Sequence, residues 1–362
     1  MGITRFQPAV DDTDELNAWW GETFGALWLD PERNAWLYEK NPCIGKDGPG
    51  PWLCRRNGRI VGQQAELPFD LKVGSEVRRA VWAVELHVDE AWRVRGIGPA
   101  LIATLVESNA IVCTLDISDD AKTLLRRGGF VEVGIACTYR RALNARRALR
   151  MAGVPRVARK LSPVIAPILG MADALASAAI RSSGAKLVPV ERFDGRVDEV
   201  WAAASSDYPV LARRDLAAVA WRIDERPDSH RLRRYYLMRR GRTLGYVVLR
   251  PTTSSGEPSI VVVDYLAPAR WVVPMLLAVA RVARRNGAVA LSVKTLNRRA
   301  DRMLRRAGFV RRSLSHDYDR WMMVHCTAEP DVCRLLSDSD GWLITSTDSN
   351  LEQVGSEHGR SA

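Results

Sequence analysis

Cysteine and histidine are scarce in this sequence, with six and five residues among 362. No two cysteines form a C-x-x-C pair, and none stands at a metal-like spacing from a histidine. This pattern excludes a structural zinc site, and no bound metal is expected. The N-terminal stretch "MGITRFQPAVDDTDELNAWW" also lacks the basic and then apolar pattern of a secretory signal. We therefore expect a cytoplasmic protein whose cysteines are free thiols.

Long hydrophobic runs are also missing. The alanine-rich stretch "VIAPILGMADALASAAI", residues 164–180, contains Pro167, Gly170 and Asp173. It is too short and too weakly apolar to predict a membrane-spanning helix.

Acidic residues are almost absent from 140–186, where ten Lys or Arg residues accompany a single acid, Asp173. On a helical wheel, 140–152 places most of its arginines on one side and alanine and leucine on the other. Three interpretations stay open: a solvated helix packed between domains, a peripheral membrane contact through 140–186, or an RNA-binding arm. No aromatic residue lies among these arginines to stack on bases, so binding of nucleic acid is not expected.

Three sequence phrases occur twice, in the same order. "WLYEKNP" at 36–42 resembles "WRIDERP" at 221–227, "RRNGRIVG" at 55–62 resembles "RRGRTLG" at 239–245, and "LLRRGGFV" at 124–131 resembles "MLRRAGFV" at 303–310. The separations are similar, between 179 and 185 residues. The repeats therefore predict a duplicated domain of about 145 residues, which is an ordinary domain size.

Each repeat has the pattern of mixed α/β structure. In the first we expect helices at 13–27, 31–39, 99–108 and 119–127, with strands at 51–56, 59–71, 78–88, 111–117 and 130–140. In the second we expect helices at 196–204, 213–223, 272–285 and 298–306, with strands at 187–192, 234–240, 243–250, 259–266, 288–294 and 309–313. A further short strand is expected at 342–345.

A glycine-containing loop follows the third strand of the first repeat. The strand "VWAVELHV" leads into Arg93-Val94-Arg95-Gly96-Ile97-Gly98, and Pro99 opens an apolar helix. Glycines before a helix allow close backbone approach, and the unpaired amides there point at an anion. Arg93 and Arg95 add positive charge. The loop thus predicts a pyrophosphate site.

The pattern R-x-x-G-x-G between a strand and a helix, with a later helix ending in Gly-Phe, resembles the GCN5-related N-acetyltransferase (GNAT) superfamily. The resemblance implies an α/β fold of two tandem GNAT-like domains, each a mixed, mostly antiparallel sheet flanked by helices. The ranges are 1–141 for an acyl-CoA-binding domain, 142–186 for the basic connector, 187–330 for a second domain and 331–362 for a tail.

The resemblance also implies a donor, acetyl-CoA or another acyl-CoA, bound by the loop of Arg93, Val94, Arg95, Gly96, Ile97, Gly98 and Pro99. The backbone amide of Leu86 or Val88 would polarise the thioester carbonyl. Ser118 would bond the pantetheine or cap the helix after it. The second repeat reads "APARWVVPMLLAVARVA" at this place and has no glycine before its helix. One cofactor site per chain is therefore expected.

Glu85 and His87 are the candidate catalytic residues. Strand alternation places Val81, Ala83, Glu85 and His87 on one face. Partial burial would raise the pKa of Glu85 toward that of a general base, although a salt-bridged carboxylate is the alternative. His87 has an ordinary pKa near neutrality, and Glu66 on the neighbouring strand is a third option.

The sequence departs from the family at the group that protonates the leaving thiolate. Many GNAT proteins carry a tyrosine where this chain has Leu125 in the first repeat and Leu304 in the second. Water or another group such as Tyr139 would then serve, or the protein would bind acyl-CoA without turning it over.

These features predict an N-acetyltransferase-like acyltransferase that passes an acyl group directly to an amine or hydroxyl of a small-molecule or sugar acceptor. A Fem-type transferase that uses aminoacyl-tRNA is the first alternative, and a non-catalytic acyl-CoA-binding protein is the second. Retention of the phosphate loop argues against the first alternative, because a tRNA donor needs no pyrophosphate site.

Overall fold

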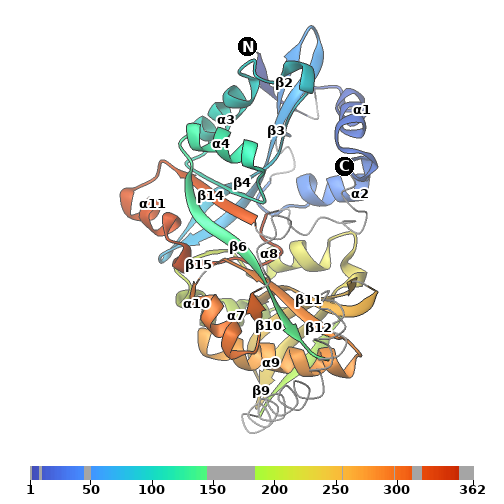
Figure 1. Cartoon of the computed structure of the whole chain (residues 1–362), viewed down its shortest axis with the longest axis vertical. Coiled ribbons are helices and arrows are strands. Elements are labelled where there is room, and N and C mark those ends of the chain that lie inside the picture. The colour runs from blue at the N-terminus through green and yellow to red at the C-terminus, as the bar shows by residue number, and fades with distance from the viewer. Residues whose placement is uncertain are drawn as a thin grey trace, which may run out of the picture.

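The computed structural model describes residues 2–7, 10–44, 50–144, 184–254, 256–296, 298–311 and 320–349. Figure 1 shows an elongated molecule with two lobes, each built from strands covered by helices. Most of the predicted basic connector (145–183) and the end of the predicted tail (350–362) lie outside the described residues.

The first half contains the elements expected from its sequence, with a few additions. Its elements are β1 (Ile3–Arg5), α1 (Thr13–Phe24), η1 (Ala26–Leu29), α2 (Pro31–Asn34), the π-helical turn η2 (Ala35–Glu39), β2 (Trp52–Arg56), β3 (Arg59–Val73), β4 (Glu76–Val88), η3 (Glu90–Trp92), α3 (Ile97–Ser108), β5 (Ile111–Leu115), α4 (Asp119–Arg127) and β6 (Val131–Ala142). β1 was not predicted.

The second half repeats this order. Its elements are β7 (Ala185–Val190), α7 (Arg196–Ala204), η5 (Ser205–Asp207), β8 (Val210–Ala212), α8 (Leu216–Val219), the π-helical turn η6 (Ala220–Asp224), η7 (Ser229–Arg231), β9 (Arg233–Arg239), β10 (Arg242–Ser254), β11 (Glu257–Leu266), α9 (Ala269–Arg285), β12 (Ala290–Thr295), α10 (Arg298–Arg306), β13 (Val310–Arg311), β14 (Arg320–Cys326), α11 (Pro330–Ser337), η8 (Ser339–Gly341) and β15 (Trp342–Leu343). The sequence did not predict β8, β14 or α11.

The strands of the two lobes join in one sheet, whose order in the described part of the chain is β1-β2-β3-β4-β5-β14-β6-β12-β11-β10-β9-β7. Neighbours are antiparallel except in the β4–β5, β11–β12 and β8–β15 pairs. Helices flank this sheet, so the predicted mixed α/β fold with a mostly antiparallel sheet is confirmed.

Two strands join the halves by crossing between them. The start of β6 (131–136) pairs with β14, while its end (137–142) pairs with β12 of the second half. Figure 1 shows β6 running from one lobe into the other. β14 in turn comes from the C-terminal part of the chain and lies between β5 and β6 of the first half. Each lobe is therefore completed by a strand from the other half of the sequence.

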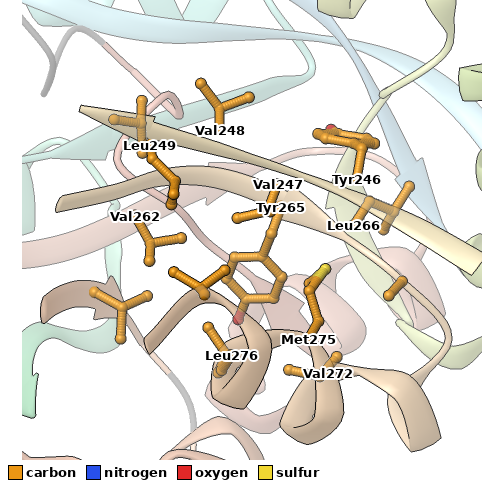
Figure 2. Packing of buried hydrophobic residues seen from close by; sticks show 14 of the residues in the cluster. Tyr246, Val247, Val248, Leu249, Val262, Tyr265, Leu266, Val272, Met275 and Leu276 are labelled. Atoms are coloured by element: carbon orange, nitrogen blue, oxygen red, sulfur yellow. The ribbon is translucent and has the colours of Figure 1, made fainter. Parts of the chain in front are cut away.

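The core of the second lobe lies between β10, β11 and α9. In α9 the residues Val272, Met275, Leu276 and Val279 recur at helical spacing, and all four are at most 1% exposed. Figure 2 shows Val272, Met275 and Leu276 directed from the helix toward Tyr265 and its neighbours on the strands. Such a continuous apolar contact fixes the helix against the sheet.

Two expectations from the sequence are wrong. Cys326 and Cys333 form a disulfide that joins β14 to α11, so they are not free thiols; Cys43, Cys54, Cys113 and Cys137 are free. The second concerns the start of the amphipathic helix considered over 140–152, because β6 extends to Ala142; residues 145–152 lie outside the described part of the chain. Sheet pairing with β12 takes precedence there over local helical periodicity.

Arg141, on β6, is buried and connects this strand to the second lobe. Its guanidinium donates a hydrogen bond to the carbonyl of Ala307, which follows α10.

No helix among the described residues is long and apolar enough to cross a membrane. The described part of the chain also holds no cluster of three metal-ligating side chains.

Candidate active site

The loop between β4 and α3 has the backbone conformation of an anion site. Val94 and Gly96 both adopt left-handed conformations, with φ of 55° and 80°. Gly96 is the N-cap of α3 and offers no side chain to the helix. Within the described part of the chain, the amides of residues 94–98 donate to no acceptor, whereas the amide of Ala100 donates to Gly96. The loop therefore presents several unpaired N–H groups at a helix N-terminus.

Two arginines lie beside these amides. Arg93 Nε donates to the carbonyl of Val88 at 3.2 Å, and the Arg95 guanidinium lies 5.0 Å from the ring centre of Trp92. Both arginines are exposed. Their positive charge adds to that of the helix N-terminus, which favours a pyrophosphate.

The strands in front of this loop separate. β4 and β5 pair only at Val81–Val112 and Trp82–Cys113, so the last six residues of β4 have no partner in β5. On its other side, β4 remains bonded to β3, where Asp89 donates its amide to Val61 at 2.9 Å. Because amides alternate along a strand, that of Val88 points away from β3, toward the opening.

A bulge at Glu85 gives the Leu86 amide the same direction. The β3–β4 register shifts here, because Gln63 pairs with His87 but Ala65 pairs with Val84. Glu85 has φ of 60°, and its carbonyl accepts a bond from Gln63 Nε2 at 3.3 Å. The trans peptide then directs the Leu86 amide away from Gln63. This geometry directs the amides of Leu86 and Val88 away from their partners on β3, toward the gap between β4 and β5.

The same bulge overturns the predicted alternation. Val81 and Ala83 pack on the side of α3 and α4, with Ile102 and Leu105. Beyond the bulge Leu86 and Val88 pack on that side, against Ile97 and Leu101. Glu85 and His87 contact the opposite side, that of α1 and α2. The extra residue of a bulge reverses which residues face each layer.

Glu85 is enclosed by two partners on the α2 side. Its Oε1 lies 3.4 Å from Arg33 NH2, and its Oε2 accepts a bond from Tyr38 at 3.1 Å. The side chains of Glu85 and Arg33 are 3% and 2% exposed. The pKa of Tyr38 lies well above its ordinary value because of burial and the adjacent Glu85 carboxylate. Glu85 therefore has the environment of a salt-bridged carboxylate.

Glu66 is also buried and paired, with Arg5 and with the amide group of Asn109, whose Nδ2 lies 3.1 Å from Glu66 Oε2. It faces α3 and β1, on the far side of the sheet from His87. Glu66 therefore does not share a site with Glu85 and His87.

His87 is the more accessible candidate base, with 26% of its side chain exposed. Its ring lies against Trp19 and Phe24 of α1, at centroid distances of 5.7 and 5.4 Å. Burial lowers the pKa of His87 below its ordinary value; Asp89, 3.7 Å from Nε2, partly opposes this, and Arg93 adds to it. His87 is thus neutral near pH 7 and can accept a proton.

A cleft of about 780 Å³ opens beside His87. Its walls are α1, the β2–β3 turn and the segment after β4. It is lined by Glu15, Ala18, Trp19, Glu22, Thr23, Arg56, Asn57, Arg59, Ile60, Val61, His87, Asp89, Glu90, Ala91, Trp92 and Arg93. No sequence pattern indicated that α1 and the β2–β3 turn line this cleft, because the two segments meet only in the folded chain.

Ser118 caps α4, accepting a bond from the amide of Ala121 at 3.2 Å. Tyr139 is wrong as the donor to a thiolate, because it belongs to the core of the second lobe. Its pKa lies above the ordinary value through burial and a hydrogen bond with Asp301 on α10. Leu125 packs with Ile102 in the core.

The corresponding place in the second lobe is closed. The first amide of α9, that of Ala269, donates to the Asp207 carboxylate at 2.7 Å. A Cβ on Gly245 would lie 2.6 Å from the Ala267 Cβ, so the segment before α9 packs directly on β10. The Asp207 carboxylate thus accepts a hydrogen bond at the helix N-terminus that corresponds to the anion site of the first lobe.

Comparisons with known proteins concern the family and the fold. A family model described as the acetyltransferase (GNAT) family matches residues 13–109. No curated protein matches the sequence significantly. Among solved structures, a GCN5-related N-acetyltransferase from Anabaena variabilis has a TM-score of 0.61 at 13% identity, covering 92% of this chain and 74% of the other.

Two further structures share the fold. N-Myristoyltransferase from Saccharomyces cerevisiae with bound myristoyl-CoA has a TM-score of 0.52 at 11% identity and covers 91% of this chain and 86% of its own. A probable N-acyltransferase from Enterococcus faecalis has a TM-score of 0.60 at 11% identity, with 90% and 72% covered. At these identities the similarity concerns the fold. Residues 13–109 of this protein therefore match the acetyltransferase (GNAT) family model, and the chain as a whole shares the fold of these solved structures.

Proposed function

We propose that the protein transfers an acetyl or other acyl group from acyl-CoA directly to an amine or hydroxyl of a small-molecule or sugar acceptor. One observation supports this most strongly. The bare amides of residues 94–98 lie at the N-terminus of α3, next to the gap where β4 leaves β5. A pyrophosphate at those amides would place a thioester in that gap, near the amides of Leu86 and Val88.

The acceptor would occupy the 780 Å³ cleft on the other side of β4. There His87 takes the proton of the attacking N–H or O–H group while that atom bonds to the acyl carbon. The C–S bond breaks, and the thiolate takes a proton from water, because Leu125 stands where a tyrosine would donate one. The resulting hydroxide takes the proton held by His87, which returns the imidazole to its neutral form. The amides of Leu86 and Val88 stabilise the charge on the carbonyl oxygen.

The second lobe, in this proposal, is a duplicated domain that has lost its donor site. The Asp207–Ala269 bond and the tight packing at Gly245 support this. A cytoplasmic location and contact with a membrane surface through 140–186 remain predictions from the sequence.

Calorimetry with acetyl-CoA and with longer acyl-CoA tests the donor site. Gly96→Trp puts a large side chain beside the bare amides and should abolish binding. Gly241→Trp is the matched control: its φ of 78° is close to the 80° of Gly96, and it also has no atom within 4 Å of a Cβ. The control should bind like the wild type. Absence of binding by the wild type would contradict the proposal and favour a tRNA donor.

Release of CoA thiol with a panel of amines and sugars tests turnover. We expect release with at least one acceptor and its loss in His87→Gln, since glutamine cannot take a proton. Tight acyl-CoA binding with no thiol release from any acceptor would instead favour a non-catalytic acyl-CoA-binding protein.

A further inference from the structure

Glu85 occupies a strained position in β4. It is a non-glycine residue at φ of 60° in the middle of a strand, where two residues, Glu85 and Leu86, stand opposite the single Gln64. A side chain in the left-handed region costs free energy and persists only where its surroundings hold it. The structure shows contacts on both the backbone and the side chain of this residue.

The backbone of the bulge is held from β3. Gln63 Nε2 donates to the Glu85 carbonyl at 3.3 Å, while Gln63 Oε1 accepts from Trp20 Nε1 at 2.8 Å. The neighbouring Gln64 donates to the Val84 carbonyl at 3.0 Å. Gln63 and Gln64 are at most 1% exposed. The peptide group that carries the Leu86 amide therefore has a fixed direction.

The side chain of the bulge is held from the α2 segment. Arg33 and Tyr38 bind the two carboxylate oxygens of Glu85. Arg33 is itself held, since its guanidinium stacks 4.2 Å from the ring centre of Trp28 and bonds to Asn34 at 3.3 Å. A charge pair this deeply buried is strongly oriented, because either partner alone would be an uncompensated charge.

We propose that Glu85 is a positioning residue: its buried pair with Arg33 holds the bulge so that the Leu86 amide points at the thioester carbonyl. The inference rests on the proposed function and replaces the base role first expected of Glu85. Its carboxylate transfers no proton. It acts through the Leu86 amide, whose hydrogen bond with the carbonyl oxygen strengthens as negative charge develops there.

Kinetics of Glu85→Gln and Arg33→Met separate the two roles. If Glu85 positions the amide, both variants should lower kcat about 100-fold, the effect expected of a misplaced group. KM for acyl-CoA and the acid limb of the pH–rate profile should stay as in the wild type. If Glu85 were the base, Glu85→Gln would lose the acid limb and Arg33→Met would keep kcat within a few fold, which would overturn the proposal.

The double variant Glu85→Met with Arg33→Met separates an effect on positioning from an effect on folding stability. Replacing both charges with apolar groups removes the uncompensated charge and should restore thermal stability. The kcat should remain about as low as in the single variants, because the bulge is no longer held. Recovery of kcat together with stability would show a merely structural role and overturn the proposal.

A spectroscopic test needs no acceptor. S-Acetonyl-CoA, a ketone analogue of acetyl-CoA, is added to protein labelled with [15N]leucine. In the wild type we expect a downfield shift of the Leu86 amide proton, and in Glu85→Gln a smaller shift at equal affinity for the analogue. The same shift in both proteins would overturn the positioning role, whereas an absence of binding by the wild type would instead contradict the proposed function.

Discussion

Trp36 and Trp221 each donate a hydrogen bond from Nε1 to the other's backbone carbonyl, at 2.7 and 2.8 Å. They stand 185 residues apart, and each is the second residue of a π-helical turn, η2 or η6. Their ring centroids lie 5.7 Å apart. Equivalent residues that bond reciprocally indicate a local two-fold relation between the halves, which supports the duplication proposed from the sequence.

Trp221→Phe should lower the free energy of unfolding more than Trp82→Phe does. Both rings are buried, but Trp82 Nε1 has no hydrogen-bond partner among the described residues. The two variants therefore lose similar ring volume, while Trp221→Phe also leaves the Trp36 carbonyl without its donor. The expected difference is about 1 kcal/mol, measured by urea denaturation. Equal losses would mean that the reciprocal bonds add nothing.

Local patterns in the sequence predicted most of the elements and the loop at 93–98. The loop was readable because Gly96, Gly98 and Pro99 are constrained by backbone sterics alone. The bulge at Glu85 was not, since "VELHV" has the ordinary composition of a strand and a bulge depends on both strands of a pair.

Contacts between distant segments were also beyond sequence reasoning. Arg33 and Tyr38 reach Glu85 across 52 and 47 residues, and no spacing rule connects them. β14 enters the sheet beside β5, about 200 residues earlier in the chain, so its apolar pattern could not show where it pairs. The Cys326–Cys333 bridge follows from the same placement, because α11 folds back onto β14.

Val94→Gly should stabilise the protein and weaken its binding of acyl-CoA. Val94 is a β-branched residue at φ of 55°, and its side chain is fully exposed, so no packing offsets the strain. Glycine adopts this conformation freely, and we expect a gain of about 1 kcal/mol in the free energy of unfolding. Its freedom also disorders the amides of residues 94–96, which raises Kd in calorimetry.

Val77→Gly is the matched control, since Val77 is also exposed but lies in the regular part of β4. Glycine in a strand should destabilise the protein and leave the affinity for acyl-CoA unchanged. A loss of stability in Val94→Gly would show that the left-handed valine is not strained.

Asp348→Ala should be strongly destabilising. Asp348 bonds to Arg214 at 2.8 Å, and Arg214 also contacts Asp264 at 3.2 Å; all three side chains are at most 3% exposed. Burial lowers the pKa of Arg214, but the two carboxylates outweigh it and raise that pKa, so the arginine stays charged. Removing one carboxylate leaves a buried charge partly uncompensated.

The expected loss for Asp348→Ala is about 3 kcal/mol in the free energy of unfolding, measured by urea denaturation. Asp331→Ala is the control: its ion pair with Arg334 is 88% and 78% exposed, and its removal should change nothing measurable. Similar losses of unfolding free energy in both variants would show that burial does not strengthen the contribution of the Arg214 ion pairs to stability.

The rate of acyl transfer should decrease at acid pH, and the decrease should begin below the pH range in which histidine ordinarily titrates. Burial lowers the pKa of His87, and Arg93 lowers it further, against the opposing effect of Asp89. Only the neutral imidazole accepts a proton, so kcat/KM should fall as the pH drops through the lowered pKa.

Asp89→Asn removes a nearby charge that favours the protonated ring, and should shift the acid limb to still lower pH. Arg93→Gln should shift it the opposite way. Profiles of kcat/KM from pH 4.5 to 8, taken from initial rates of CoA thiol release, would show both shifts. If both variants kept the wild-type limb, the titrating group would be one other than His87, and the proton would have to leave the acceptor by another route.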